Sequence, residues 1–306
     1  MVRFILERLA WTVPVLLGVS LIVFLVLALA PGDTAQALAG PDATQADVEA
    51  LRAALGLDQP LPVQYLRFLG RLARLDLGRS AVTSRPVTVE IADNLGPTFE
   101  LAVAAMAIAV VLGMVLGVLS AIQRGSLLDN LFMLVALFGV SMPIFWLGLM
   151  LMLFFAVELR WLPTTGIGGP EYLVLPAVTL SGGSLAIIAR MTRSSVLEVF
   201  GEDHVRTARA KGLQERTVVL GHVLRNALIP TVTAIGLQFG YLLAGTVLTE
   251  TVFARPGLGR MLVDAINLRD VGLAQGGIMV LATSFVLINL LVDVAYVYLD
   301  PRIKYG

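Results

Sequence analysis

Nucleophilic and titratable side chains are sparse in this sequence of 306 residues. Ser181 and Ser184 flank two glycines inside an apolar run, and a serine nucleophile needs a histidine within hydrogen-bond reach. Both histidines, His204 and His222, instead lie in the polar, basic stretch that follows. The residues therefore argue against an intramembrane serine protease, and a crossing of two helices at small residues explains the serine–glycine cluster better.

Patterns that bind phosphate or metal are absent from the sequence. No GxxxxGK[ST] occurs, so any ATP that drives this protein must bind to another chain. No HExxH occurs, and zero cysteines exclude disulfides and thiolate metal sites. We therefore expect no catalytic, cofactor-binding or metal-binding residues in this chain.

The polar segment with the clearest organisation is VRTARAKGLQERTVVLGHVLRNALIP, residues 205–230. Good helix formers over Glu202–Ala210 have acids first and bases last, an order that suits the helix dipole. Gly212 is placed to end that helix in a left-handed conformation. A second helical pattern begins at Gln214 and leads into a membrane run. Its expected apolar face consists of Leu220, Val223, Leu224 and Ala227.

Two interpretations of this segment remain open from its residues alone. Residues 190–226 carry seven basic and four acidic side chains, an excess that favours contact with anionic lipid. The glycine break and the small residues Thr207, Ala208 and Ala210 favour a short helix that enters a groove of a partner protein. Charge should matter more in the first case, and the geometry of the turn more in the second.

The apolar runs identify the chain as an integral membrane protein. Hydrophobic residues make up 57% of the sequence and charged residues 14%, and the mean hydropathy is +0.85. A run of about 20 apolar residues crosses a bilayer as a helix, because lipid offers the backbone no hydrogen-bond partners. One run is shorter, and Pro176 and Gly182-Gly183 interrupt it. The six expected helices are Ala10–Ala30, Leu101–Ile122, Leu131–Val157, Leu173–Ala189, Ala227–Thr249 and Val271–Val292.

The distribution of Lys and Arg predicts that both termini are cytoplasmic. In that orientation twelve basic residues, Arg302 and Lys304 among them, lie in cytoplasmic segments, whereas the short outside loops hold four. The first run is about twice as long as the roughly 7–15-residue core of a signal peptide, so we expect it to stay as a membrane helix.

We expect a single membrane domain over residues 1–306, with an extracytoplasmic insertion at 31–100 and a cytoplasmic loop at 190–226. In the insertion, Thr44 begins a helix and Gly56 ends it. A second amphipathic stretch follows, with Leu66, Leu69, Leu72 and Ala73 on one face. The residues leave open whether the insertion only covers the pore mouth or docks a delivery protein.

Several segments resemble, in chain order, the permease subunits of the dipeptide/oligopeptide (glutathione-like) ABC importers. The resemblance covers essentially the whole chain, and the set of motifs is highly specific. The segments are LAPGD (29–33), LGLDQPLPVQYLRFLGR (55–71), DLGRS (76–80), PIFWLG (143–148), WLPTTG (161–166), VRTARAKGL (205–213), LRNALIP (224–230), ETVFARPGLGRMLVDAI (250–266) and VDVAYVYLDPRI (292–303).

The resemblance implies an all-α integral membrane protein of the ABC importer permease type, with six transmembrane helices, in the bacterial cytoplasmic (inner) membrane. The chain would form half of a pathway for dipeptides, oligopeptides or glutathione, in contact with membrane lipid. A second homologous permease subunit, two ATP-binding subunits that hold ATP and Mg, and an extracytoplasmic substrate-binding protein would be its partners. Neither enzymatic activity in this chain nor a nucleic-acid partner is expected.

The resemblance also implies that the segment before Gly212 is the coupling helix, which docks on the ATP-hydrolysing subunit. The wider ABC permease pattern has an acidic residue where this sequence has Arg206, so Arg206 suits an acidic groove instead. The residues expected to contact the ATPase subunit are Glu202, Asp203, Arg206, Thr207, Ala208 and Gly212.

Two further residues are candidates for the translocation pathway. Gln238 either lines that pathway or bonds to a neighbouring helix, and Pro143 either kinks its helix or contacts substrate. The main alternative function is a secondary, ion-coupled transporter. Such proteins place ionisable groups inside the membrane, whereas the six runs contain none and Glu250 lies at a run end.

Overall fold

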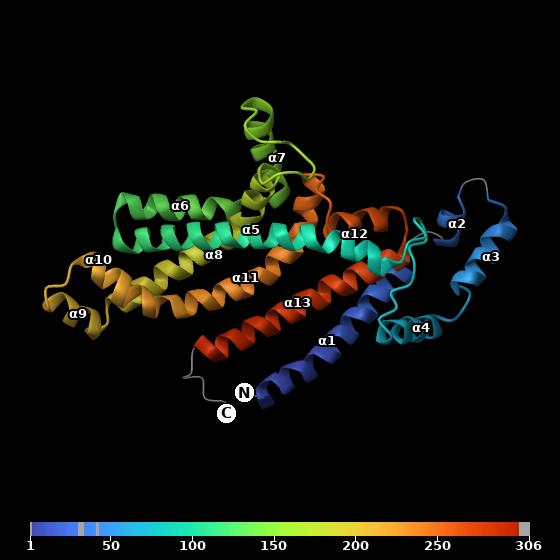
Figure 1. The fold of residues 1–306 in the computed structure, drawn as a ribbon, viewed down its shortest axis with the longest axis horizontal. Coiled ribbons are helices and arrows are strands. Elements are labelled where there is room, and N and C mark those ends of the chain that lie inside the picture. Colours follow the sequence, from blue (N-terminus) through green and yellow to red (C-terminus); the bar gives the residue numbers. More distant parts are fainter. Residues whose placement is uncertain (1, 30–33, 41–42, 300–306) are drawn as a thin grey trace. The chain divides into compact units, whose positions relative to one another are not determined.

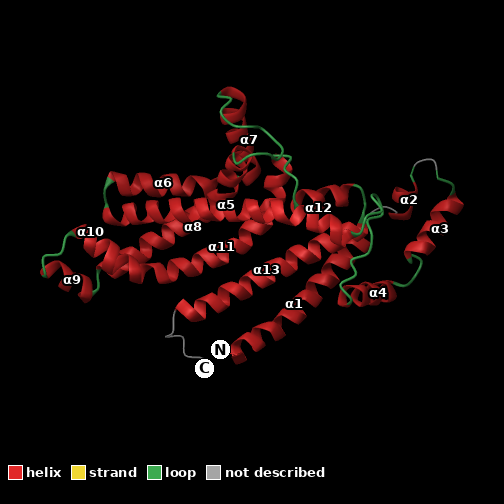
Figure 2. Cartoon of the chain, in the orientation of Figure 1, coloured by secondary structure: helices red, strands yellow, loops and turns green. Residues whose placement is uncertain are grey.

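The computed structural model describes residues 2–29, 34–40 and 43–299. Arg302 and Lys304, which contributed to the predicted orientation, lie outside these ranges. The regular elements of the described residues are helical (Figure 2), beside one isolated antiparallel bridge between Arg79 and Pro86. In chain order they are α1 Val2–Ala28, α2 Thr34–Ala39, α3 Gln45–Leu55, α4 Leu61–Ala73, α5 Val87–Ile122, α6 Leu127–Ser141, α7 Ile144–Leu151, the π-helix η1 Met152–Glu158, α8 Glu171–Phe200, α9 Asp203–Ala210, α10 Glu215–Thr217, the π-helix η2 Val218–Val223, α11 Leu224–Val252, α12 Leu258–Asn267 and α13 Val271–Leu299.

The predicted all-α membrane fold is confirmed. Among the described residues, five helices are long and apolar enough to cross a membrane, and a bent pair of helices brings the number to six if it counts as one span. The spans are Glu7–Ala28, Val87–Ile122, Leu127–Ser141 with Ile144–Glu158, Glu171–Phe200, Pro230–Val252 and Val271–Val294.

The third expected helix, Leu131–Val157, is not continuous. α6 ends at Ser141, and α7 begins at Ile144 after a bend of 108°. Pro143 disfavours the helical conformation in the residue before it, and Met142 is extended at φ −107° and ψ 139°. The proline therefore separates two helices, where one kinked helix was expected.

Two other boundaries differ from the prediction. α8 runs without interruption for 30 residues through Pro176 and Gly182-Gly183, which were expected to break it. Prolines are tolerated in membrane helices where nearby groups satisfy the freed carbonyl. α5 begins at Val87, so the last part of the predicted insertion, residues 87–100, belongs to a long helix instead.

The chain divides into two compact units. The first unit comprises the residues up to Thr98 together with Pro256–Leu287. The second comprises Phe99–Arg255 together with the residues from Ile288 onward. The long helices α5 and α13 contribute residues to both units.

Helix α8 is the centre of the second unit, where it packs against α6, α7 and α11 (Figure 1). Alanine and leucine dominate the core, which permits close approach of the helices. This core contains Leu101, Ala105, Met106, Ala109, Ala177, Leu180, Ile188 and Leu242.

Glycines set the distance between α8 and its neighbours. A Cβ atom at Gly139 of α6 would lie 2.6 Å from the carbonyl oxygen of Gly182, and one at Gly117 of α5 would lie 2.5 Å from the carbonyl oxygen of Ala189. Ser181 donates a hydrogen bond to the carbonyl of Val178, one turn earlier in the same helix, at 2.9 Å. The serine–glycine cluster is therefore a helix crossing, as expected from its small residues.

In the first unit, the insertion packs on α1 through aromatic side chains of α4. The rings of Phe24 and Phe68 stack with centroids 6.3 Å apart, and the Tyr65 hydroxyl lies 3.0 Å from Ser20 Oγ. The predicted apolar face of α4 is only partly right: Leu72 packs against the cluster of Phe24 and Phe68, whereas Leu66 is 67% exposed. The aromatic rings bury more area than leucine does, and they select the face at Tyr65 and Phe68.

The predicted ends of α3 are confirmed. Thr44 and Asp47 form a capping box, and their hydrogen bonds lower the pKa of the Asp47 carboxyl. Gly56 ends the helix in the left-handed conformation, at φ 69°. Within the described part of the chain no side chain of α3 is fully buried, and the helix packs against α2.

The glycine crossing generates a stability prediction. Gly139→Ala places a methyl group against backbone of α8, which cannot rotate away, and should destabilise the protein by about 1–3 kcal/mol. Gly183→Ala, one residue from the crossing and with nothing within 4 Å of the added Cβ, is the matched control. Thermal unfolding of the purified protein in detergent should show a lower midpoint for Gly139→Ala only. Equal midpoints for the two variants would contradict the close crossing.

Candidate functional site

Helix α9 presents two different faces. Its apolar side chains Val205 and Ala208 are buried at 0% and 6% exposure, against side chains of α5, α8, η2 and α11. The polar residues around them are exposed. Of the residues predicted to contact an ATPase subunit, Ala208 therefore anchors the helix inside this chain, whereas the exposed set consists of Glu202, Asp203, Arg206, Thr207 and Gly212.

The turn after α9 has the predicted left-handed glycine. Gly212 adopts φ 78°, its N–H donates to the carbonyl of Arg209 at 2.9 Å, and the N–H of Leu213 donates to the carbonyl of Ala208 at 3.4 Å. Nothing lies within 4 Å of an added Cβ at Gly212. The position therefore requires glycine because of its backbone conformation and not because of crowding.

Arg209 holds the two sides of this turn together. Its guanidinium donates two hydrogen bonds to the carboxylate of Glu215, at 2.6 and 3.1 Å, and lies 5.2 Å from the ring centroid of Phe200. The hydrogen bonds lower the pKa of the Glu215 carboxyl and raise the pKa of Arg209. The pair is therefore charged at neutral pH, and its contribution is lost only as pH falls through the lowered pKa of Glu215.

A second polar contact joins the start of α9 to α11. His204 Nδ1 lies 3.0 Å from a carboxylate oxygen of Glu202, and its Nε2 lies 3.3 Å from the side-chain nitrogen of Asn226. Glu202 is thus engaged with its own segment, which leaves Asp203 and Arg206 as the most exposed charges of the helix, at 96% and 70%.

The π-helix η2 changes the apolar face that the sequence predicted. Leu220 was expected to be buried but is 55% exposed, whereas Val218, Val219 and Val223 are buried. A π-turn adds one residue to the helical repeat, so an apolar series counted at α-helical spacing fails across it. No residue type in this segment marks a π-turn.

A buried ion pair that the sequence analysis missed ties α6 to α8 in the same unit. Arg193 donates two hydrogen bonds to the carboxylate of Asp129, at 2.9 and 2.8 Å, and the Ser120 hydroxyl and the Gly125 N–H also donate to Asp129. Asp129 is 3% exposed. The sequence analysis counted Arg193 only as one of the basic residues of the cytoplasmic loop. In the structure it pairs with Asp129, which lies 64 residues earlier in the chain.

Ionisable groups also occur near the end of α11. Glu250, expected at the end of an apolar run, is fully buried, and Arg255 is 2% exposed with its guanidinium 2.5 Å from Glu100. The helices are longer than the apolar runs, so they include charges that the runs exclude. Glu250 lies in the last turn of α11 and Arg255 follows that helix, whereas Glu100 lies inside α5, where Arg255 pairs with it.

The two pathway candidates lie apart from α9 in the sequence, one within a helix and one at the bend between two helices. Gln238 is buried on α11 at 6% exposure, and Pro143 is exposed just before α7, at the bend after α6. The polar groups of α9 and its flanks are exposed, which suits docking of another protein.

Comparison with known proteins gives relatives along the full length of the chain. It is 48% identical over 305 residues, 100% of both chains, to the "Glutathione transport system permease protein GsiC" of Pectobacterium atrosepticum, and 45% identical, with the same coverage, to the protein of that name from Escherichia coli K12. A solved structure of the inward-facing MetNI methionine ABC transporter superposes with a TM-score of 0.60, covering 70% of this chain and 97% of that one at 20% identity, which shows a shared fold.

Two family descriptions match successive parts of the sequence. Residues 1–102 match "Binding-prot-dependent transport system membrane comp, N-term", and residues 113–305 match "Binding-protein-dependent transport system inner membrane component". Family descriptions and full-length relatives agree with the resemblance seen in the sequence motifs. The chain therefore belongs to the inner membrane components of binding-protein-dependent transport systems.

Proposed function

We propose that this chain is the permease subunit of an ATP-driven importer of short peptides, with glutathione as the first substrate to test. The observation that carries the proposal is 45–48% identity, over the full length, to permeases named for glutathione transport. Uptake of labelled glutathione by proteoliposomes that contain the complete importer tests it. Uptake that needs no ATP would contradict it and favour ion-coupled transport.

The proposal also includes the other subunits of such an importer. A second homologous permease subunit completes the pathway, two ATP-binding subunits hold ATP and Mg, and an extracytoplasmic substrate-binding protein delivers the substrate. Gln238 stays a candidate for the pathway because it is a buried polar side chain on a membrane helix. Pro143 enters the proposal as the residue at the bend between α6 and α7.

Coupling would take place at α9. Its exposed residues Asp203, Arg206 and Thr207 would meet the ATPase subunit, while Val205 and Ala208 fasten the helix to the ends of the membrane helices. A movement of the ATPase subunit would then reach α8 and α11 through packed side chains. In the lipid interpretation, anionic lipid would contact the same segment, and no movement would pass from it to the membrane helices.

A pair of substitutions distinguishes coupling to the ATPase subunit from contact with lipid as the role of α9. Gly212→Val forces a β-branched residue into a left-handed conformation, at a cost of about 1–3 kcal/mol, and should tilt α9. Lys211→Gln removes an exposed charge next to it and leaves the turn intact. We expect glutathione uptake per ATP hydrolysed to fall about five- to thirtyfold in Gly212→Val, the ratio that corresponds to roughly 1–2 kcal/mol. Lys211→Gln should stay near wild type.

Lys211 is a better control than the neighbouring Arg209, because Arg209 holds the turn through Glu215 and Phe200. Subunit assembly is measured by co-purification, so that a lost complex is not mistaken for lost coupling. If Lys211→Gln abolishes uptake while Gly212→Val transports normally, charge and not turn geometry fixes the segment, and the lipid interpretation holds.

The proposed orientation has its own test, since the chain contains no cysteine and single cysteines give no background. Ala46, Ala81 and Gln214 are exposed in the structure. With both termini in the cytoplasm, cysteines at Ala46 and Ala81 should react with an impermeant maleimide on intact cells. A cysteine at Gln214 should react only after the membrane is opened. Labelling of Gln214 from outside would reverse the orientation and remove α9 from the ATPase side.

A further inference from the structure

A cavity of about 340 Å³ opens in the first unit. Its walls are the loop before α5, the first turns of α5, and α12 with the start of α13. In the proposed orientation these segments lie at the extracytoplasmic end of the unit. None of the roles assigned above uses this cavity.

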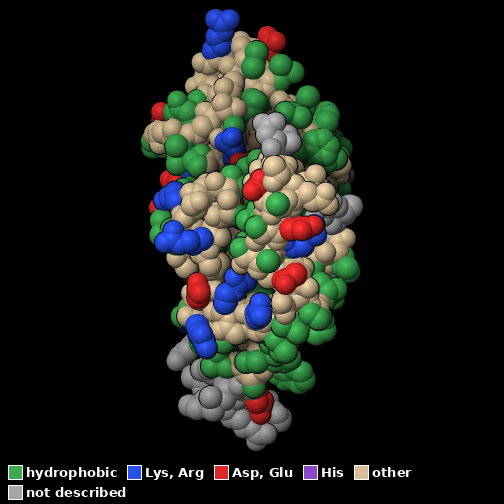
Figure 3. Space-filling model, turned by 90° about the vertical axis from the view of Figure 1, so that its right-hand side faces the viewer, with side chains coloured by type: hydrophobic (Ala, Val, Ile, Leu, Met, Phe, Trp, Pro, Cys, Tyr) green, Lys and Arg blue, Asp and Glu red, His purple; other side chains and the backbone are tan. Residues whose placement is uncertain are grey.

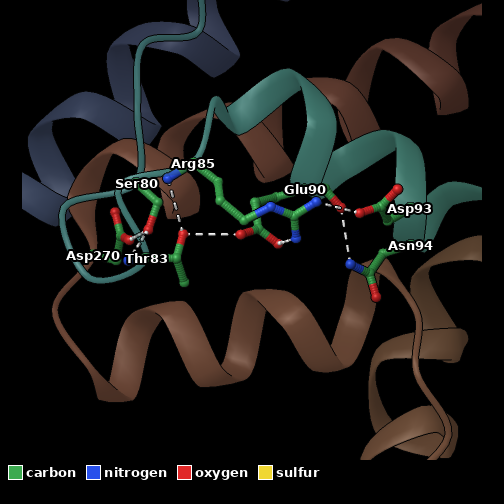
Figure 4. A network of polar contacts seen from close by, with 7 residues as sticks. All are labelled: Ser80, Thr83, Arg85, Glu90, Asp93, Asn94 and Asp270. Carbon is green, nitrogen blue, oxygen red and sulfur yellow. Dashed lines mark hydrogen bonds and ion pairs between the residues drawn. The ribbon is translucent and has the colours of Figure 1, made fainter.

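Hydrogen bonds fix the loop that forms one wall, so the cavity is preformed. The buried carboxylate of Asp270 accepts hydrogen bonds from the Ser80 hydroxyl and, at 3.3 Å, from the Val82 N–H. Thr83 donates to Glu90 at 2.9 Å (Figure 4). A surface that needs no reordering loses less entropy when a partner binds.

The floor of the cavity is apolar and reaches the surface. Met261 and Leu273 lie at its base with 8% and 7% exposure, while Val82 and Leu268 at its mouth are 47% and 57% exposed. An apolar centre with a polar surround is typical of a protein–protein interface. A bound small molecule would leave Val82 and Leu268 in water, whereas a protein surface would cover both.

The polar lining has an excess of negative charge. The hydrogen bonds to Asp270 come from neutral groups, so this residue adds a formal negative charge to the lining. Glu90 pairs with Arg85 at 3.3 Å, and Asp264 lies 3.8 Å from Arg260. Arg85 and Asp93, which pair with each other at 2.7 Å beside Glu90, add one charge of each sign (Figure 4). Two negative charges are therefore in formal excess at the cavity, although acidic and basic side chains are intermingled on the face drawn in Figure 3.

We propose that this cavity is a socket for an arginine side chain projected by the extracytoplasmic substrate-binding protein. The aliphatic stem of arginine would pack on Met261 and Leu273, and its guanidinium would meet the exposed carboxylate of Asp264. Arginine is enriched in interfaces, where it anchors to such mixed pockets. The inference rests on the proposed function, because it takes the binding protein of that importer as the partner.

The test measures the Kd of the purified binding protein for the complete importer in lipid nanodiscs. Asp264 is 60% exposed and contacts Arg260 only at 3.8 Å, so Asp264→Arg should fold normally. Reversing this charge should weaken binding about tenfold or more, within the range of desolvated charge contacts at interfaces. Glu49→Arg on α3, an exposed charge reversal in the same unit but outside the cavity, is the matched control and should stay within about twofold.

Each other outcome has a defined meaning. If Asp264→Arg lowers the thermal midpoint of the importer, Asp264→Asn replaces it, with about threefold weakening expected from a lost partial contact. Wild-type affinity in the Asp264 variants, or weakening by Glu49→Arg alone, would overturn the socket and assign docking to α3. Binding of free glutathione that is lost in Asp264→Arg would make the cavity a peptide site instead. If the wild-type importer does not bind the protein at all, the proposed function fails together with the socket.

Discussion

The backbone-to-backbone approach of helices on α8 is the constraint on which the second unit depends. Lipid tails are as apolar as leucine, so burial in a membrane does not by itself bring helices together. Association then relies on van der Waals contact, and contact is greatest where no side chain intervenes. Gly139 and Gly182 provide this between α6 and α8, and Gly117 provides it between α5 and α8.

The position of α9 follows from this packing. Val205 and Ala208 contact the ends of helices whose spacing the glycines have already fixed, and the core there also contains Val196, Val218 and Val223. The Asp129–Arg193 pair holds α6 to α8 near the same helix ends. A short helix of eight residues would not be stable in water alone. Its geometry, including the left-handed Gly212, therefore depends on the membrane helices beneath it.

The first unit is built on a different interaction. Aromatic rings of α4 pack on α1, and a network around Asp270 and Glu90 fixes the loop before α5. Polar groups can serve as structural ties here because the network lies in a loop and at helix ends, where water satisfies the groups that remain exposed. The result is a preformed polar surface at one end of apolar helices, suited to transient contact with another protein.

The sequence by itself determined the class of the protein, which apolar runs form helices, the ends of α3 and the glycine turn after α9. Each of these depends on local chemistry: apolar length, a capping box, or a residue that tolerates positive φ. The break between α6 and α7 is also local, because Pro143 disfavours a helical Met142. Tertiary structure decided the continuity of α8, the face of α4 and the burial of Val218 and Val219 in η2. It also decided that Asp129 pairs with Arg193. These features depend on which partner surface a residue meets, and residues far apart in the chain supply that surface.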